Sequence, residues 1–262
     1  MPEITVTTVV VLCVAAALAG WVDAVVGGGG LLQIPALLIA FPQLTPATAL
    51  GTNKAVAVAG TSVAAVTYAR RHPVDVRLAL RLGGLALLAS AGGALFASAV
   101  SAEFLRPMIM VLLLAVAAFV VLRPNFGTQY IAGDPIPTTR RRMALVLLVA
   151  GVGIGFYDGL LGPGTGTFLI IALVGLLHLS MLTASATAKV VNVGTNLGAL
   201  IVFGSQGMVL WKLALGMAVF NMLGGWLGAH MAIRRGSGFI RVVLLVVVTV
   251  LVGRLARDQW LA

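Results

Sequence analysis

The sequence predicts an all-α integral membrane protein with about eight hydrophobic segments arranged in two homologous repeats. Apolar residues make up 60% of the 262 residues and charged residues 9%, which is too little polar surface to cover a water-soluble globule. The apolar residues form long stretches, and the two halves of the chain align with each other. These three observations together predict a multi-pass protein with an internal duplication.

The membrane segments are predicted from length, because a helix needs roughly 20 apolar residues to cross a bilayer. Stretches that meet or approach this length lie at residues 4–25, 45–69, 78–100, 105–122, 143–161, 184–203, 211–229 and 240–256. Two further apolar pieces, 31–41 and 166–177, are too short to cross as regular helices. No Lys or Arg precedes the first stretch, so we expect it to belong to the mature fold and not to a cleaved signal.

The formal net charge of +10 comes mainly from basic residues in short loops between the apolar stretches. Such loops orient membrane proteins, so we expect a lipid bilayer as the environment and no nucleic-acid partner. The single cysteine, Cys13, excludes an internal disulfide, and no cluster of ligating residues predicts a metal or another cofactor.

The duplication becomes visible when the chain is aligned with itself at an offset of 135 residues. Asp23 then falls on Asp158 and Lys54 on Lys189. Apolar coincidences are expected by chance, but the chain has only three lysines and two of them align. We therefore predict two repeats, residues 1–123 and 143–262, joined by a cytoplasmic linker at 124–142.

The loop charges predict that the two repeats have inverted topology. The loop after the Lys54 stretch carries Arg70, Arg71, Arg77 and Arg81, whereas its counterpart in the second half has only Lys212, and one loop later the bias reverses. Because positive loops face the cytoplasm, equivalent loops should lie on opposite sides, as in many secondary transporters. Inversion needs an odd number of membrane crossings in each repeat, and three full spans supply it. Each opening segment, 4–41 and 143–177, should therefore enter and leave on one side as a broken or re-entrant helix.

Each opening segment has an aspartate followed by a glycine cluster, VDAVVGGGGLLQIP in the first repeat and YDGLLGPGTGTF in the second. Gly costs about 1 kcal/mol and Pro about 3 kcal/mol inside a helix, so both helices are predicted to break. Non-helical backbone is tolerated in lipid only where it is buried in protein or lines a wet cavity, and the N-terminus of the second half-helix attracts anions. The alternative is that the glycines only permit close helix packing.

The second pair of motifs, TALGTNKAVAVAG and TASATAKVVNVGTN, places a lysine in each repeat on the order of 9–13 Å into the membrane. A charge at that depth is expensive and is a functional-site hypothesis, with the two aspartates as candidate partners. Asn192 and Asn196 share a helical face with Lys189 and could line one wall of a pocket. The alternative is a pair of inert buried ion pairs that fix the packing.

At these motifs the chain resembles the sulfite exporter TauE/SafE family, and its YfcA-like branch in particular. The resemblance is carried by GGGGLLQIPALL, ALGTNKAVAVAGTSVA, GFYDGLLGPGTGTF and TASATAKVVNVGTNLGALIVFG, and extends over roughly residues 15 to 257. It implies a multi-pass permease of the bacterial inner membrane that exports sulfite, sulfoacetate or a related small organosulfur anion.

The two pairs of motifs and the family resemblance together predict a secondary transporter of a small anion that works by alternating access. The residues expected to bind the anion are Lys54, Lys189, Gly28, Gly29, Gly30, Gly164, Thr165, Gly166, Thr52, Asn53, Thr187, Asn192 and Asn196. Asp23 and Asp158 are expected to neutralise the lysines or to carry a coupled proton or other ion. Two alternatives stay open: a carrier or channel whose aspartates bind the transported cation or proton, and a membrane enzyme or assembly subunit. No nucleophile–base set is recognisable, so we expect no enzyme.

Overall fold

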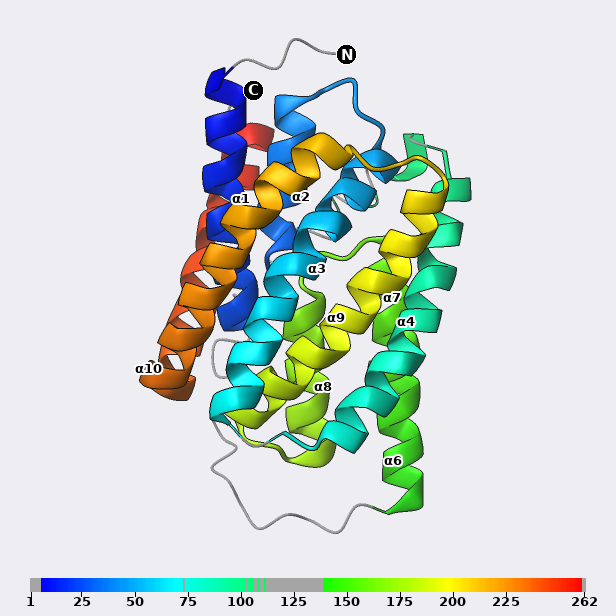
Figure 1. Cartoon of the computed structure of the whole chain (residues 1–262), viewed down its shortest axis with the longest axis vertical. Helices are drawn as coiled ribbons and strands as arrows, with labels where there is room; N and C mark the ends of the chain where they lie inside the picture. Colours follow the sequence, from blue (N-terminus) through cyan, green and yellow to red (C-terminus); the bar gives the residue numbers. More distant parts are fainter. Residues whose placement is uncertain are drawn as a thin grey trace.

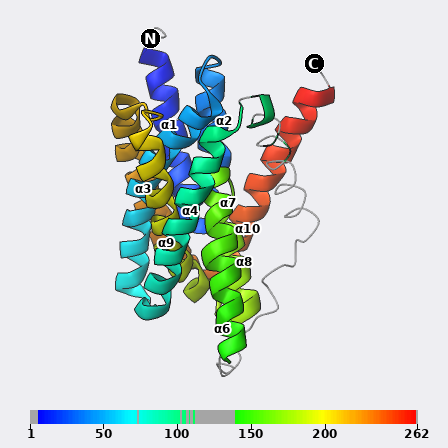
Figure 2. The ribbon, with the colours of Figure 1, turned by 90° about the vertical axis from the view of Figure 1, so that its right-hand side faces the viewer.

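The computed structural model describes residues 6–72, 74–101, 103–105, 108, 111 and 139–260. Within these ranges the chain is helical and has no β-strand, which confirms the predicted all-α class. The helices form an elongated bundle, with most axes along its long dimension (Figure 1, Figure 2). Five helices in these ranges are long and apolar enough to cross a membrane. Most of the predicted segment 105–122 and of the linker 124–142 lies outside the described residues.

The first half opens with a helical hairpin. Helix α1 (Val6–Val26) runs from the upper end of the bundle toward its middle, and α2 (Gly30–Ala40) returns to the upper end beside it (Figure 1). The long helices α3 (Pro46–Arg71) and α4 (Val76–Ala99) then descend and ascend. The glycine cluster therefore breaks the first segment, as the sequence predicts.

The second half opens with a rod made of α6 (Arg140–Val146), the π-helical η1 (Leu147–Gly153) and α7 (Ile154–Leu160). This rod rises from the lower end, the chain breaks at the Gly-Pro-Gly stretch, and α8 (Thr165–Leu177) returns downward (Figure 1). Helix α9 (Met181–Ser205) ascends, and α10 (Trp211–Trp260) descends and then reverses at Gly236, whose φ is 70°.

Helix α6 begins within the last three residues of the predicted linker. Arg140, Arg141 and Arg142 were expected in the linker, but they form the first turn of α6. The reason is a local cap, because the Thr139 side chain accepts a hydrogen bond from the Arg142 amide at 3.3 Å. The helix thus begins as soon as a suitable N-cap residue precedes it.

Helices α3 and α9, which carry the two aligned lysines, begin with the same kind of cap. Thr45 accepts from the Thr48 amide and Ser180 from the Thr183 amide, each at 3.2 Å. Each lysine lies eight residues after the first residue of its helix, Pro46 or Met181. At 1.5 Å per residue this is about 12 Å along the axis, which places both lysines deep inside the bundle.

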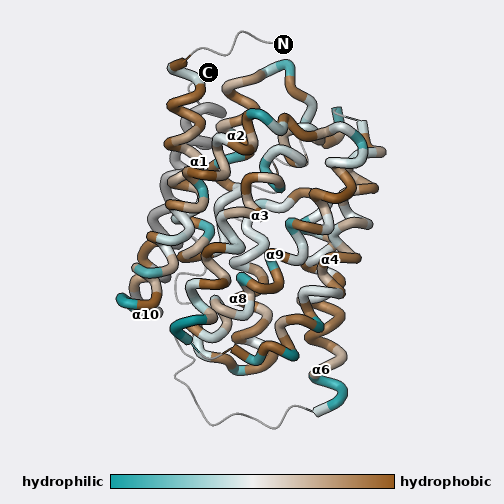
Figure 3. Tube along the Cα trace, viewed as in Figure 1, coloured by the Kyte–Doolittle hydropathy of each residue, from teal (hydrophilic) through white to brown (hydrophobic). Residues whose placement is uncertain are grey.

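Basic residues gather at the lower end of the bundle. They end α3, begin α6 and precede the reversal of α10. Figure 3 shows hydrophilic positions mainly at the two ends and apolar positions along the sides. This distribution suits a protein whose sides face lipid, with the more basic end expected in the cytoplasm.

Candidate functional site

The two helix breaks meet in the middle of the bundle and pack directly on each other. The Gly166 amide, in the first turn of α8, donates to the Gly27 carbonyl oxygen at 3.1 Å. Gly27 has a φ of +81°, and neither glycine has room for a Cβ because the partner's backbone occupies that space. Glycine is therefore required here for close approach of two chain segments from opposite halves of the sequence.

The end of α1 is capped by side chains from three other helices. Thr167 of α8 donates to the Val26 carbonyl at 2.7 Å, and Tyr68 of α3 donates to the Ala24 carbonyl at 3.0 Å. The Lys189 ammonium group of α9 donates to the Asp23 carbonyl. The Ala24 and Val26 carbonyl groups at the break are thus satisfied by protein, which a membrane interior requires, and the Asp23 carbonyl accepts from the Gly27 amide as well as from Lys189.

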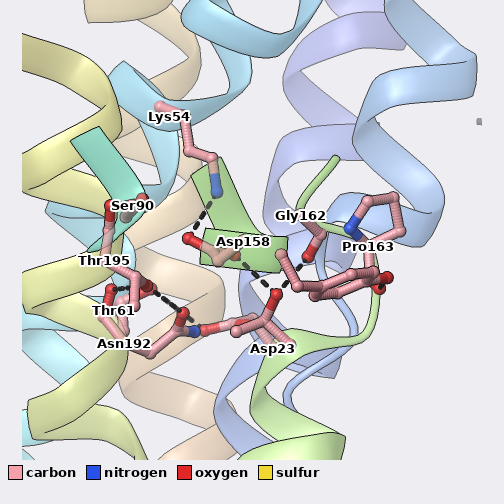
Figure 4. A network of polar contacts seen from close by, with 11 residues as sticks. Asp23, Lys54, Thr61, Ser90, Asp158, Gly162, Pro163, Asn192 and Thr195 are labelled. Atoms are coloured by element: carbon pink, nitrogen blue, oxygen red, sulfur yellow. Dashed lines mark hydrogen bonds and ion pairs between the residues drawn. The ribbon is translucent and has the colours of Figure 1, made fainter. Parts of the chain in front are cut away.

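The C-terminal end of α7 is held mainly by contacts with the Gly-Pro-Gly stretch that follows it. Tyr157 donates to the Pro163 carbonyl at 2.6 Å, and Thr165 lies within hydrogen-bond distance of the Gly162 carbonyl and of Asp158 Oδ1, at 2.7 and 2.6 Å. These contacts fold the Gly-Pro-Gly stretch back onto α7 and point Asp158 inward (Figure 4). The second aspartate is therefore fixed by residues that follow it in sequence.

The two lysines form ion pairs that cross between the halves. Lys54 Nζ lies 2.6 Å from Asp158 Oδ2, and both side chains are almost fully buried (Figure 4). Lys189 Nζ lies 3.6 Å from Asp23 Oδ2, which also accepts from the Thr61 hydroxyl at 3.1 Å. Each half thus supplies the lysine for the aspartate of the other half, and the formal charges of the four side chains cancel.

A small polar cavity lies between the two breaks. The volume open to the centre of a water molecule is about 20 Å³, which is room for roughly one water. The lining residues that were predicted for the site are Asp23, Gly29, Gly30, Asn53, Lys54, Asp158, Thr165, Asn192 and Asn196. The cavity thus gathers amide, hydroxyl, ammonium and carboxylate groups at the centre of an apolar bundle.

The other predicted residues lie outside the cavity lining: Gly28, Thr52, Gly164, Gly166, Thr187 and Lys189. Thr52 accepts from the Leu210 amide at 3.1 Å, and Thr187 donates to the Thr183 carbonyl at 2.9 Å. Each threonine precedes its lysine by two residues, about 200° around the helix, so it faces a different neighbour. Lys189 points to the end of α1, so the two lysines are not equivalent.

The cavity also contains residues that the sequence did not single out as site residues. Thr61 of α3, Asn221 of α10 and Gln33 of α2 all line it. Gln33 lies three residues after the first glycine cluster, so its place beside the break follows from the sequence. Asn221 lies in the middle of the apolar stretch 211–229, and a polar residue there is a signal of helix contact or function that could have found it.

The arrangement suits a small oxyanion better than a metal ion. Ammonium and amide donors converge on one space, whereas groups of three or more His, Cys, Asp or Glu side chains are absent from the part of the chain that the structure describes. The N-terminal turns of α2 and α8 also border the cavity, through Gly30 and Thr165, and helix N-termini favour negative charge.

Comparison with known proteins places the chain among membrane transporters. The sequence model of the family described as sulfite exporter TauE/SafE matches residues 12–255. The chain is 39% identical to the probable membrane transporter protein ORF9 of Sinorhizobium sp, covering 94% of this chain and 92% of that protein. It is 34% identical to the probable membrane transporter protein YfcA of Escherichia coli, with 95% and 90% covered. No solved structure matches the chain.

Proposed function

Because this chain belongs to the sulfite exporter TauE/SafE family of membrane transporters, we propose that it is a secondary transporter that moves a small anion across the bacterial inner membrane. As a member of this family it is a membrane transporter and not an enzyme. The proposed substrate is sulfite or an organosulfonate such as sulfoacetate, and the proposed mechanism is alternating access.

The observation that carries the proposal is the position of Lys54. Its side chain is 1% exposed, yet its ammonium group borders a polar cavity where two broken helices meet. An intramembrane charge of this kind is costly and marks a substrate or ion pathway. An anion in the cavity would meet Lys54 together with the N-terminal turns of α2 and α8.

The charge balance supports a coupled proton. Two ammonium and two carboxylate groups cancel, so sulfite entering as the hydrogen sulfite monoanion would add one uncompensated negative charge in a medium of low dielectric. Protonation of Asp158 or Asp23 would restore neutrality, and protonation of Asp158 would also release Lys54 for the anion. We propose that the anion and a proton move together for this reason.

The size of the cavity supports alternating access. Room for about one water is too little for sulfite, whose four heavy atoms must displace the surrounding side chains or helices. Two inverted repeats would supply this movement by shifting against each other around the site. In support, α3 descends while its counterpart α9 ascends (Figure 1), and Gly93 packs on the Phe156 carbonyl as Gly228 packs on the Trp21 carbonyl.

The inverted topology predicts where inserted reporters will lie. A reporter inserted after residue 72 should read cytoplasmic, and one after residue 206 should read periplasmic, because the ends of α3 and α9 lie at opposite ends of the bundle (Figure 1). Fluorescence of green fluorescent protein and activity of alkaline phosphatase, inserted at each site in turn, give complementary readouts. Finding both sites on one side would contradict the inverted arrangement.

Counterflow in proteoliposomes tests the transport function. Purified protein is reconstituted into vesicles loaded with unlabelled sulfite or sulfoacetate, and uptake of the radiolabelled anion is followed. We expect transient accumulation well above that of protein-free vesicles, because a carrier exchanges labelled for unlabelled substrate. The contrary result is that neither anion accumulates, whereas an imposed proton or Na⁺ gradient drives a flux of that cation. That result would replace the proposed anion transporter with the alternative of a cation carrier.

The geometry argues against that alternative. Asp158 Oδ2 is engaged by the Lys54 ammonium group and Oδ1 by the Thr165 hydroxyl. A transported cation would therefore have to approach oxygen atoms that already hold donors, one of them positively charged. An anion instead approaches the positive partner of the pair.

A further inference from the structure

The amide side chains of Gln33 and Asn221 form an oriented pair at the wall of the cavity. Asn221 Nδ2 donates to the Ala16 carbonyl at 2.8 Å and to Gln33 Oε1 at 3.3 Å. A carbonyl oxygen only accepts, so the Asn221 atom facing Ala16 must be the nitrogen. Both hydrogens of that nitrogen are then used, and Gln33 must turn its oxygen toward Asn221.

This orientation leaves the other end of Gln33 without a partner. Gln33 is 1% exposed, it lines the cavity, and its Nε2 atom is buried with no hydrogen-bond partner. The atom carries two N–H donors, and a buried donor without an acceptor is strongly unfavourable. Asn221 fixes the Gln33 amide in an orientation that leaves Nε2 unpartnered, which is energetically unfavourable. This arrangement points to a hydrogen-bond acceptor that enters the cavity and binds Nε2.

The pair also makes the site asymmetric. The offset of 135 residues that aligns the halves places Phe168 opposite Gln33 and Ala86 opposite Asn221. Phe168 packs edge-on against Tyr157, and Ala86 is buried, so neither offers a hydrogen bond donor. The first broken segment therefore brings an amide donor to the cavity at a position where the second has none, while Asn53 and Lys54 approach from α3.

We infer that Gln33 Nε2 is a substrate-binding donor, oriented by Asn221, and that it selects an oxyanion with at least two acceptor oxygens. One oxygen is held by Lys54 and another by the Gln33 amide. This inference rests on the proposed anion transport and adds to it the residue that orients the bound anion. Asn221 is a positioning residue, because its donors are used by Ala16 and Gln33.

The test replaces Gln33 with methionine, which has similar length and no donor. In the unliganded protein Gln33→Met removes the unpartnered Nε2 but also the Oε1 atom that accepts from Asn221, so we expect its melting temperature in detergent to lie near or slightly below that of the wild type. We expect the sulfite concentration for half-maximal counterflow to rise about tenfold or more, because a hydrogen bond to a charged group is lost. The melting-temperature rise that sulfite gives the wild type should shrink in parallel.

Ile39→Met serves as the matched control, since Ile39 lies on the same helix and is 62% exposed on the outer side of the bundle. A second variant, Gln33→Glu, keeps the oxygen that accepts from Asn221 and changes only the unpartnered atom into an acceptor. We expect it to abolish the response to sulfite.

The inference is overturned if Gln33→Met keeps the sulfite dependence of Ile39→Met, or if Gln33→Glu still responds to sulfite. Failure of the proposed function would give a different result. If the wild type itself moves neither sulfite nor sulfoacetate, the proposed anion transport is wrong, and the inference about Gln33 is wrong with it.

Discussion

Replacing Lys54 with methionine is expected to abolish anion transport. The ammonium group borders the cavity and is the positive group closest to the entering anion, so its loss removes a charged hydrogen bond worth about 1.5–3 kcal/mol. That corresponds to a loss of affinity of about 10- to 150-fold, before any effect on the conformational change. Counterflow of radiolabelled sulfite in proteoliposomes gives the measurement.

The single variant also leaves the Asp158 carboxylate buried without its partner, which could unfold the protein instead of silencing it. The double variant Lys54→Met/Asp158→Asn removes both charges and should regain wild-type melting temperature while remaining inactive. Lys212→Met, which changes the exposed lysine at the start of α10, should transport normally. If the double variant transports sulfite, Lys54 is not an anion ligand.

Replacing Lys189 with methionine is expected to act mainly on stability. Lys189 is fully buried, does not line the cavity, and donates to the backbone carbonyl of Asp23 as well as pairing with its carboxylate. Removing one partner of a buried ion pair costs about 3–5 kcal/mol. The melting temperature should therefore fall markedly, whereas the folded fraction should keep a near-normal sulfite dependence.

The double variant Lys189→Met/Asp23→Asn distinguishes the two lysines. It neutralises the carboxylate but leaves the Asp23 carbonyl without its lysine donor, so it should recover less stability than Lys54→Met/Asp158→Asn does. Melting temperatures of the four variants in one detergent provide the comparison. If Lys189→Met keeps wild-type stability and loses transport, the two lysines are equivalent ligands and our assignment fails.

The sequence predicted the features that depend on local composition. Gly27 and Gly162 break their helices where glycine is the residue that adopts a positive φ, of 81° and 88°. The depth of Lys54 and Lys189 follows from their distance to the helix start, and aspartates were their only candidate partners in the membrane. These conclusions need helix geometry and the cost of buried charge, but no knowledge of packing.

The remaining features depend on how the helices pack. Nothing in the offset alignment indicates that Lys54 pairs with Asp158 rather than Asp23, because the exchange follows from the crossing of the two breaks. Thr52 and Thr187 were placed in the site by proximity in sequence, but they lie on other faces of their helices. Asn221 reaches the cavity from α10, a helix far away in sequence.

The most direct test of the account is an experimental structure with bound selenite, the selenium analogue of sulfite, located by its anomalous scattering. We predict a selenium peak between the two helix breaks, with one selenite oxygen at hydrogen-bond distance from Lys54 Nζ and another from Gln33 Nε2. Unbroken helices through both glycine clusters, or a peak remote from Lys54 with the cavity still closed, would contradict the account.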